Sequence, residues 1–215
     1  MIELFNHIRH LDFDWIFAQY GNMIYLILFM VIFIETGLVI FPFLPGDSLL
    51  FTAGLFARAG HMNLGFLFLL LFFAAVLGDN TNYLIGRKIG LRVFQWKFGG
   101  RVLVKQKYLE RTNEFFTKHG PKTIIMARFV PIVRTFTPFV AGVGKMKYSK
   151  FLSFDILGGA IWIGSMTLAG YLLGEIPWFK ENIEKVALGI IFLSVTPMIF
   201  QFMKAYLNKR KEKKY

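Results

Sequence analysis

Long apolar runs alternate with short polar breaks along the chain, and the length of each run predicts how it sits in a membrane. A helix that crosses the hydrocarbon core of a bilayer needs about 20 mostly apolar residues. Three runs are long enough, and they cover residues 64–89, 151–173 and 186–203. We expect each of them to form one fully spanning helix.

Two further apolar runs, residues 23–56 and 115–143, are broken in the middle and predict a different element. Proline removes a backbone donor and clashes with the preceding turn, so a helix ends where it stands. The part of each run after the break has about ten residues, or about 15 Å of helix, which is half a bilayer. We therefore expect two re-entrant hairpins, although residues 23–41 are long enough to cross completely. The breaks lie at Pro42, Pro45 and Gly46 in the first run and at Pro131 in the second.

The two broken runs resemble each other, and each is followed by a long apolar helix. The positions that recur at a constant offset are Phe41, Ala53 and Gly54 in the first run and Phe129, Ala141 and Gly142 in the second. Residues 23–90 and 115–173 thus form two similar parts, as in membrane transporters whose site lies between repeats. The sequence predicts one all-α polytopic domain over residues 1–215, with two inverted re-entrant hairpins, about three spanning helices and an N-terminal amphipathic helix.

Charged residues are segregated from the apolar runs, which sets the orientation of the chain. The net charge is +12, and 19 of the 25 Lys and Arg lie in residues 87–122, 145–150 and 204–215. Basic segments remain on the cytoplasmic side of a membrane, so we expect a cytoplasmic segment at 91–114 and a cytoplasmic C-terminal tail. The first hairpin then opens to the outside and the second to the cytoplasm. A nucleic-acid-binding protein would instead present its basic residues on a polar folded surface.

The chain contains no cysteine, which excludes a disulfide framework, a cysteine-ligated zinc site and a thiol nucleophile. Its four histidines are scattered, without the spacing of metal ligands, and the chain has neither a phosphate-binding loop nor a nucleophile elbow. We therefore expect no metal, no cofactor and no catalytic constellation, so the sequence does not predict an enzyme.

Four ionisable residues lie at the two breaks: Glu35 and Asp47 at the first, and Arg128 and Arg134 at the second. A charge at the bilayer centre costs at least about 2.5 kcal/mol, so we expect these side chains to meet near the midplane. The guanidinium fork matches phosphate oxygens, which predicts that the two arginines bind a phosphate group. Because burial disfavours an ionised carboxyl group, the two acids are expected to carry protons and thereby release the arginines. The alternative is a pair of ion bridges that only clip the hairpins together.

A second polar cluster follows on the helix after the first hairpin and consists of Asp79, Asn80, Tyr83 and Arg87. Asp79 and Tyr83 recur at near-helical intervals with Gly86 and Gly90 and share a face with them, and the alternative place for Arg87 is the cytoplasmic rim. We expect the cluster to support the site, with ordinary helix packing as an equal alternative. Asp155 is interpreted as a residue favoured by the dipole at the start of its helix.

Three ordered motifs resemble those of the bacterial DedA family, which belongs to the SNARE-associated Golgi, or VTT-domain, membrane proteins. They are Glu35 followed by Phe41-Pro42 and Pro45-Gly46-Asp47, Gly78-Asp79-Asn80 followed by Tyr83, Gly86-Arg87 and Gly90, and Arg128-Phe129 followed by Pro131, Arg134 and Ala141-Gly142. The resemblance implies a multi-pass inner-membrane protein with opposed hairpins that moves a lipid in dependence on the proton-motive force. The family's essential acidic and basic positions correspond to Glu35, Asp47, Arg128 and Arg134.

The leading prediction is a transporter that carries a phosphate-headed lipid, undecaprenyl phosphate, from the outer to the cytoplasmic leaflet of the bacterial inner membrane. Its partners would be that lipid and protons, and a homo-oligomer is left open. The alternatives are a phosphatidylethanolamine flippase or scramblase, a proton-coupled exporter of small cations, an enzyme that consumes a lipid phosphate, and a purely structural protein.

Overall fold

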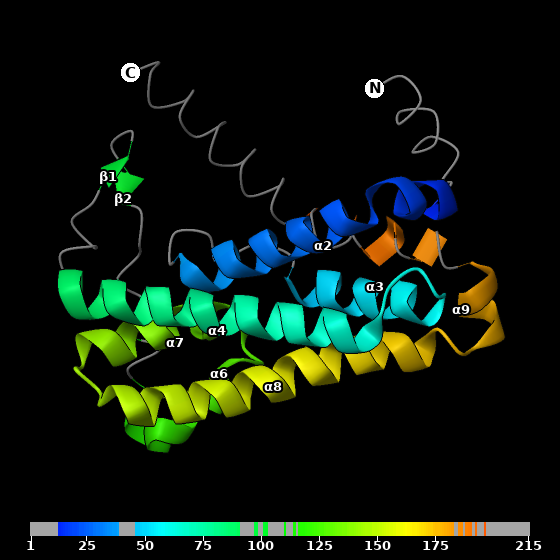
Figure 1. The fold of residues 1–215 in the computed structure, drawn as a ribbon. Helices are drawn as coiled ribbons and strands as arrows, with labels where there is room; N and C mark the ends of the chain where they lie inside the picture. The colour runs from blue at the N-terminus through cyan, green and yellow to red at the C-terminus, as the bar shows by residue number, and fades with distance from the viewer. Residues whose placement is uncertain are drawn as a thin grey trace, which may run out of the picture. The chain divides into compact units, whose positions relative to one another are not determined.

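The computed structural model describes most of the chain between residues 13 and 196, and Figure 1 shows its elements. The described residues are 13–38, 46–90, 97–98, 101–102, 110, 114, 116–182, 185–186, 188–190, 192 and 196. They belong to two compact units. Unit 1 comprises Met1–Gly21, Leu44–Asn63 and Thr167–Tyr215, and unit 2 comprises Asn22–Phe43 and Leu64–Met166.

Three helices in the described part of the chain are long and apolar enough to cross a membrane. They are α2 (Phe13–Gly37), α4 (Leu64–Ile89) and α8 (Tyr148–Leu173). The predicted helical class is confirmed, and α4 and α8 correspond to two of the expected spans. At 26 residues each, they are about 39 Å long, which exceeds the thickness of the hydrocarbon core. The third expected span, residues 186–203, lies largely outside the described residues.

The helix α2 begins earlier than the sequence analysis places it. Residues 13–22 belong to the same helix as the apolar run that follows, and only residues 1–12 of the expected amphipathic helix lie outside the described residues. The weakest helix former in this stretch is Gly21, and one interior glycine costs only about 1 kcal/mol, which does not end a helix. The apolar part, Gln19–Gly37, has 19 residues and is long enough to cross a bilayer.

Among the described residues, four of the shorter helical elements flank the two expected breaks, and a fifth follows α8. They are α3 (Gly46–Arg58), the 3₁₀ turn η2 (Gly120–Lys122), α6 (Thr123–Ala127), α7 (Pro131–Val143) and α9 (Pro177–Glu181). β1 (Lys97–Phe98) pairs antiparallel with β2 (Arg101–Val102) inside the basic segment. Residues 91–96, 99–100, 103–109, 111–113 and 204–215 of the two expected basic segments lie outside the described residues.

The second break lies where the sequence places it, next to Pro131. α6 ends at Ala127, Val130 is extended, and Pro131 occupies the first turn of α7. An extended residue before proline follows from the clash of the proline ring with the preceding backbone. At the first break, α3 begins at Gly46, whereas Pro42 and Pro45 lie outside the described residues.

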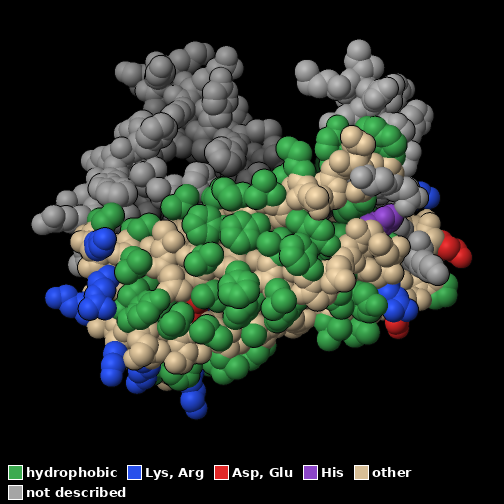
Figure 2. Space-filling model, in the orientation of Figure 1, with side chains coloured by type: hydrophobic (Ala, Val, Ile, Leu, Met, Phe, Trp, Pro, Cys, Tyr) green, Lys and Arg blue, Asp and Glu red, His purple; other side chains and the backbone are tan. Residues whose placement is uncertain are grey.

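The surface of unit 2 carries an apolar side on each long helix. The half-exposed large side chains of α4 are Phe66, Leu69, Phe73, Leu77 and Leu84, and those of the unit 2 part of α8 are Ile156, Leu157 and Ile161. Figure 2 shows hydrophobic side chains along the helices, with Lys and Arg gathered over the end of α4 and the start of α8. A soluble protein rarely exposes so much contiguous apolar surface, whereas a lipid-facing surface requires it.

Two helix crossings follow one packing rule, and glycines make both of them possible. In unit 1, a Cβ at Gly54 of α3 would lie 2.1 Å from the carbonyl oxygen of Thr167 in α8. In unit 2, a Cβ at Gly142 of α7 would lie 2.1 Å from the carbonyl oxygen of Tyr83 in α4. The opposite helices supply a second glycine to each crossing, Gly170 against Phe51 and Gly86 against Phe139. The short helix after each break therefore packs on the long helix of the other repeat.

Candidate functional site

The first ion pair of the candidate site joins the end of α2 to the start of α7. Nη2 of Arg134 donates a hydrogen bond to Oε1 of Glu35, and both side chains are buried. Arg134 lies in the first turn of α7, where its backbone N–H donates to the carbonyl oxygen of Val130. The helix start thus fixes the point from which the guanidinium extends toward α2.

The second ion pair is a group of three residues around Arg128, which caps the end of α6. Nη2 of Arg128 donates to Oδ2 of Asp79 on α4 and to Oδ1 of Asp155 on α8, both at 2.5 Å. The same nitrogen lies 3.3 Å from the backbone oxygen of Asp155. All three side chains are less than 5% exposed. Two acids from different long helices therefore share one guanidinium nitrogen.

The helix α8 presents one continuous face to the two arginines, formed by Asp155, Gly158, Gly159 and Trp162. A Cβ at Gly158 would lie 3.1 Å from Nε of Arg128, so the absence of a side chain there makes room for the guanidinium. The fully buried indole of Trp162 lies against both arginines: its ring centroid is 4.6 Å from Cζ of Arg134 and 5.8 Å from Cζ of Arg128. Both distances allow a cation–π interaction.

Asn82 ties the elements of the site together through their backbones. Its amide nitrogen donates to the carbonyl oxygen of Thr36 at the end of α2, at 3.0 Å, and to that of Thr135 in α7, at 2.8 Å. The Asn82 side chain is fully buried. Because Glu35 and Arg134 are the neighbours of these two residues in sequence, Asn82 holds the two ends of the first ion pair in place.

Three of the four residues expected to support the site make their described contacts elsewhere in unit 2. Nδ2 of Asn80 donates to the carbonyl oxygen of Val76, and its Oδ1 accepts a hydrogen bond from the hydroxyl of Tyr148. The buried hydroxyl of Tyr83 donates to the carbonyl oxygen of Met146 and accepts a hydrogen bond from Nη1 of Arg87. These contacts fix the connection between α7 and α8. Asp79 alone among the four contacts an arginine of the site.

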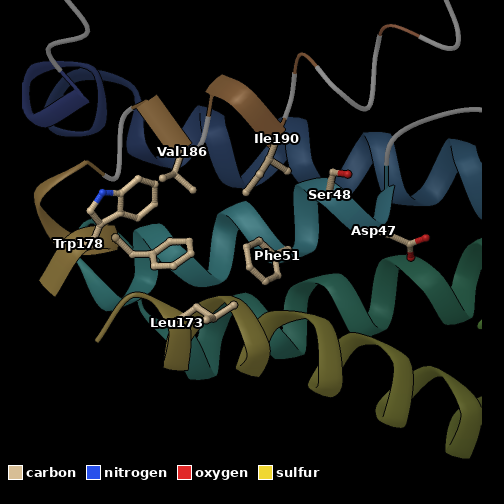
Figure 3. A pocket seen from close by; sticks show the side chains of 8 residues that line it. Asp47, Ser48, Phe51, Leu173, Trp178, Val186 and Ile190 are labelled. Carbon is tan, nitrogen blue, oxygen red and sulfur yellow. The ribbon is translucent and has the colours of Figure 1, made fainter. Parts of the chain in front are cut away.

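Asp47 belongs to unit 1, where it stands in the first turn of α3 and lines a pocket of about 520 Å³. Figure 3 shows Asp47 and Ser48 at the end of this pocket away from Trp178. The other lining residues are apolar: Phe51, Leu173, Trp178, Phe179, Val186 and Ile190. The pocket is thus an apolar recess with one acidic and one hydroxyl group at its edge.

The structure brings together Glu35 with Arg134, and Arg128 with Asp79. It adds three residues that sequence reasoning did not place at the site: Asn82, Asp155 and Trp162. The sequence signal for Asp155 is a carboxyl group within an apolar run. Because Asp155 lies only two turns after the start of α8, the helix dipole offers a simpler explanation for an acid there. The signal for Trp162 is its spacing of seven residues from Asp155, which puts both on one face of a helix.

An anion at this site would compete with carboxyl groups. The two guanidiniums are buried, and Nη2 of each donates to a carboxyl group. A phosphate group could take the place of these carboxylates as the acceptor, because carboxylate and phosphate oxygens suit the same guanidinium fork. In the described part of the chain, no three acidic or histidine side chains are grouped so that they could hold a metal ion.

Comparison with known proteins places this chain among bacterial membrane proteins. The model of the VTT domain matches residues 44–172. The protein DedA of Escherichia coli is 43% identical over 205 residues, which cover 94% of this chain and 93% of that protein. An uncharacterized membrane protein of Mycobacterium leprae is 46% identical over 86% of this chain and 82% of its own length. The inner membrane protein YqjA of Escherichia coli is 33% identical over 83% of this chain and 80% of its own length. No solved structure matches the chain.

Proposed function

We propose, for a chain that belongs to the DedA family of VTT-domain membrane proteins, that it transports a phosphate-headed lipid across the bacterial inner membrane. The proposed substrate is undecaprenyl phosphate, which moves from the outer to the cytoplasmic leaflet. The C-terminus and the basic segments would face the cytoplasm, as the distribution of Lys and Arg predicts. The two broken runs would then be re-entrant hairpins that open to opposite sides.

One observation carries this proposal: two guanidiniums are buried inside a membrane protein, within cation–π distance of the same indole. Charged residues inside a membrane domain are costly and mark substrate or ion pathways. Two nearby guanidiniums offer the positive charge and the donor geometry that a phosphate head group needs. The apolar tail of the lipid would remain in the bilayer, against the exposed apolar sides of α4 and α8.

The carboxyl groups compensate the charge of the arginines when no phosphate group is bound. Glu35 compensates the charge of Arg134 in the structure, and a phosphate group would compete with it. A protonated Glu35 no longer compensates that charge, so proton uptake would favour the phosphate-bound form. Asp47 is proposed as a further proton carrier because it is acidic and lies at the edge of an apolar recess.

The test is transport of labelled undecaprenyl phosphate in proteoliposomes, with and without an imposed pH gradient. Removing Arg134 alone would leave the Glu35 carboxylate buried without its partner, which typically costs 3–5 kcal/mol of stability. The decisive comparison is therefore between Glu35→Gln and the double variant Glu35→Gln with Arg134→Gln. The double variant removes both charges together and leaves neither partner of this pair buried without compensation, so it should fold. We expect it to lose at least about tenfold in lipid binding relative to Glu35→Gln.

Arg58 offers a matched control, because it is an arginine in an ion pair with Glu175 that lies at the surface of unit 1. Arg58→Gln should transport the lipid as the unmodified protein does, since exposed pairs contribute little. The proposal fails if the double variant moves the lipid at the rate of the unmodified protein. Excess phosphatidylethanolamine in the same assay separates the two lipid substrates. Transport of labelled undecaprenyl phosphate should slow only if the protein also accepts phosphatidylethanolamine.

A proton-coupled exporter of small cations is the second candidate, and the excess of buried acids in unit 2 favours it. The described buried acids of unit 2 are Glu35, Asp79 and Asp155, against the two arginines. A cation would bind where these carboxyl groups meet. Efflux of the cation from loaded proteoliposomes, without inhibition by undecaprenyl phosphate, would support this function and contradict lipid transport.

A further inference from the structure

The buried charges of unit 2 do not balance when every group is ionised. Three carboxyl groups face two guanidiniums in the described part of this unit, which leaves one negative charge in excess. An ionised carboxylate without compensation is very costly in an apolar interior, so such a group takes up a proton instead. One proton bound to one of the three acids makes the group of five neutral.

Glu35 is the acid that already has an arginine of its own, because Nη2 of Arg134 donates to its Oε1. Asp79 and Asp155, in contrast, are both bonded to the single Nη2 of Arg128 at 2.5 Å. The two acceptor oxygens are therefore no more than about 5 Å apart. One guanidinium compensates one carboxylate, so the second carboxyl group of this pair bears the uncompensated charge.

The geometry between the two acids points to a proton as well. The carboxyl groups of Asp79 and Asp155 each have one oxygen 2.5 Å from the same nitrogen of Arg128, which brings the two groups close together. Ionised carboxylates only accept hydrogen bonds, so two of them can bond to each other only when one is protonated. Moreover, Oδ2 of Asp155 is buried and receives no hydrogen bond from any donor among the described residues. Such an oxygen is far less costly in a neutral carboxylic acid than in a carboxylate.

We propose that Asp79 and Asp155 bind one proton between them and form a proton-binding site that acts directly on Arg128. The role of this site in coupling rests on the proposed transport function, whereas the site itself is inferred from the geometry alone. The charged groups that face the pair come from every element around it: Arg128 after α6, Arg134 in α7 and, through Arg134, Glu35 in α2. Two carboxyl groups that share a site titrate in two separate steps.

The direction of coupling follows from the charge of the pair. With one proton bound, the pair carries one negative charge and balances Arg128. A second proton would neutralise the pair and leave the guanidinium to a phosphate group, whereas loss of the first proton would hold Arg128 more tightly. Proton uptake on one side of the membrane and release on the other would thus bind and free the phosphate in turn.

The test is infrared spectroscopy of the purified protein in lipid vesicles at neutral pH. A protonated carboxylic acid has a carbonyl stretch at higher frequency than the bands of a carboxylate, and this stretch shifts in heavy water. We expect the unmodified protein to show this band, and we expect both Asp155→Asn and Asp79→Asn to lose it. Asparagine has the shape of a protonated aspartic acid, so both variants should fold, which circular dichroism would verify.

Asp47→Asn is the matched control, because Asp47 lies in unit 1 and does not enter the charge count of unit 2, and it should retain the band. Absence of the band in the unmodified protein would overturn the proposal, as would its persistence in both asparagine variants at positions 79 and 155. Loss of the band in Glu35→Gln, with retention in both Asp79→Asn and Asp155→Asn, would assign the proton to Glu35 and overturn the proposal too. The measurement is independent of transport: a protein that shows the band but moves no undecaprenyl phosphate retains the proton site and loses the proposed function.

Discussion

At the scale of single residues, each of the two guanidiniums has two kinds of partner. Its N–H groups donate to carboxyl groups, which a phosphate group can replace, whereas its central carbon lies within cation–π distance of the indole of Trp162. A cation–π interaction in a desolvated site contributes about 2 kcal/mol and does not use the N–H donors. Trp162 therefore keeps both arginines in position while their acceptors change.

Substitution of Trp162 tests this role. Trp162→Leu and Trp162→Phe both remove part of the ring volume, but only phenylalanine retains an aromatic face. We expect Trp162→Leu to bind undecaprenyl phosphate about tenfold more weakly than Trp162→Phe, because it loses the cation–π interaction with two arginines. Titration of labelled lipid into each purified variant measures the difference. Equal affinities would show that the indole only fills space.

Gly158 gives a second prediction at this scale, with Gly164 of the same helix as its control. A Cβ at position 158 would lie 3.1 Å from Nε and 3.2 Å from Cδ of Arg128, whereas one at position 164 would lie 3.5 Å from a ring atom of Phe68. Gly158→Ala should therefore lower the free energy of unfolding by about 1–3 kcal/mol. Gly164→Ala should be neutral or stabilise by up to about 1 kcal/mol through helix propensity. Thermal unfolding in detergent compares them, and equal midpoints would contradict the proposed crowding.

The site shows how far residue types alone can predict pairing. Charges inside apolar runs mark Glu35, Arg128 and Arg134 directly, because such residues are rare in a membrane segment. The partners of Arg128 depend on how α4 and α8 are rotated about their axes, and a periodic apolar helix does not determine that rotation. Asp79 and Asp155 contact Arg128, whereas Asp47, the second acid expected from the first break, belongs to unit 1.

At the scale of elements, lengths were more predictable than boundaries or packing. The apolar run 64–89 and the break before Pro131 follow from composition and from the geometry of proline. The start of α2 does not, because no strong helix breaker separates residue 13 from residue 23. The glycine pairs of the two crossings are visible in the sequence, but which helices they join depends on contacts between distant segments. The sequence suggests two repeats, and in the structure the short helix of each repeat packs on the long helix of the other: α3 on α8, and α7 on α4.

The crossing of α7 with α4 can be tested at Gly142. A Cβ there would lie 2.1 Å from the carbonyl oxygen of Tyr83 and 2.8 Å from the backbone nitrogen of Arg87, so the two backbones would have to move apart. We expect Gly142→Ala to lower the free energy of unfolding by about 3 kcal/mol, at the upper end of overpacking effects. Gly21→Ala is the control, because a Cβ at position 21 meets nothing within 4 Å. Unfolding midpoints in detergent decide, and a stable Gly142→Ala variant would contradict the tight crossing.

At the scale of the whole molecule, the distribution of basic residues predicts which end of α8 faces the cytoplasm. Lys147 lies just before this helix and Glu175 just after it, and both side chains are exposed. The chain contains no cysteine, so single cysteines can be introduced without removing any native one. In intact cells, a membrane-impermeant thiol reagent should label Glu175→Cys, and should label Lys147→Cys only after the membrane is permeabilised. The reverse pattern would invert the proposed topology.

The exchanged glycine crossings have a consequence for how the protein is made. As the ribosome synthesises the chain, α3 is made long before residues 167–170 of its partner helix exist. During that interval α3 lacks its neighbour α8, and α4 lacks its neighbour α7. Insertion must therefore be followed by a late docking step, and an insertase or chaperone that shelters half-made chains would serve this protein more than one whose repeats fold in turn.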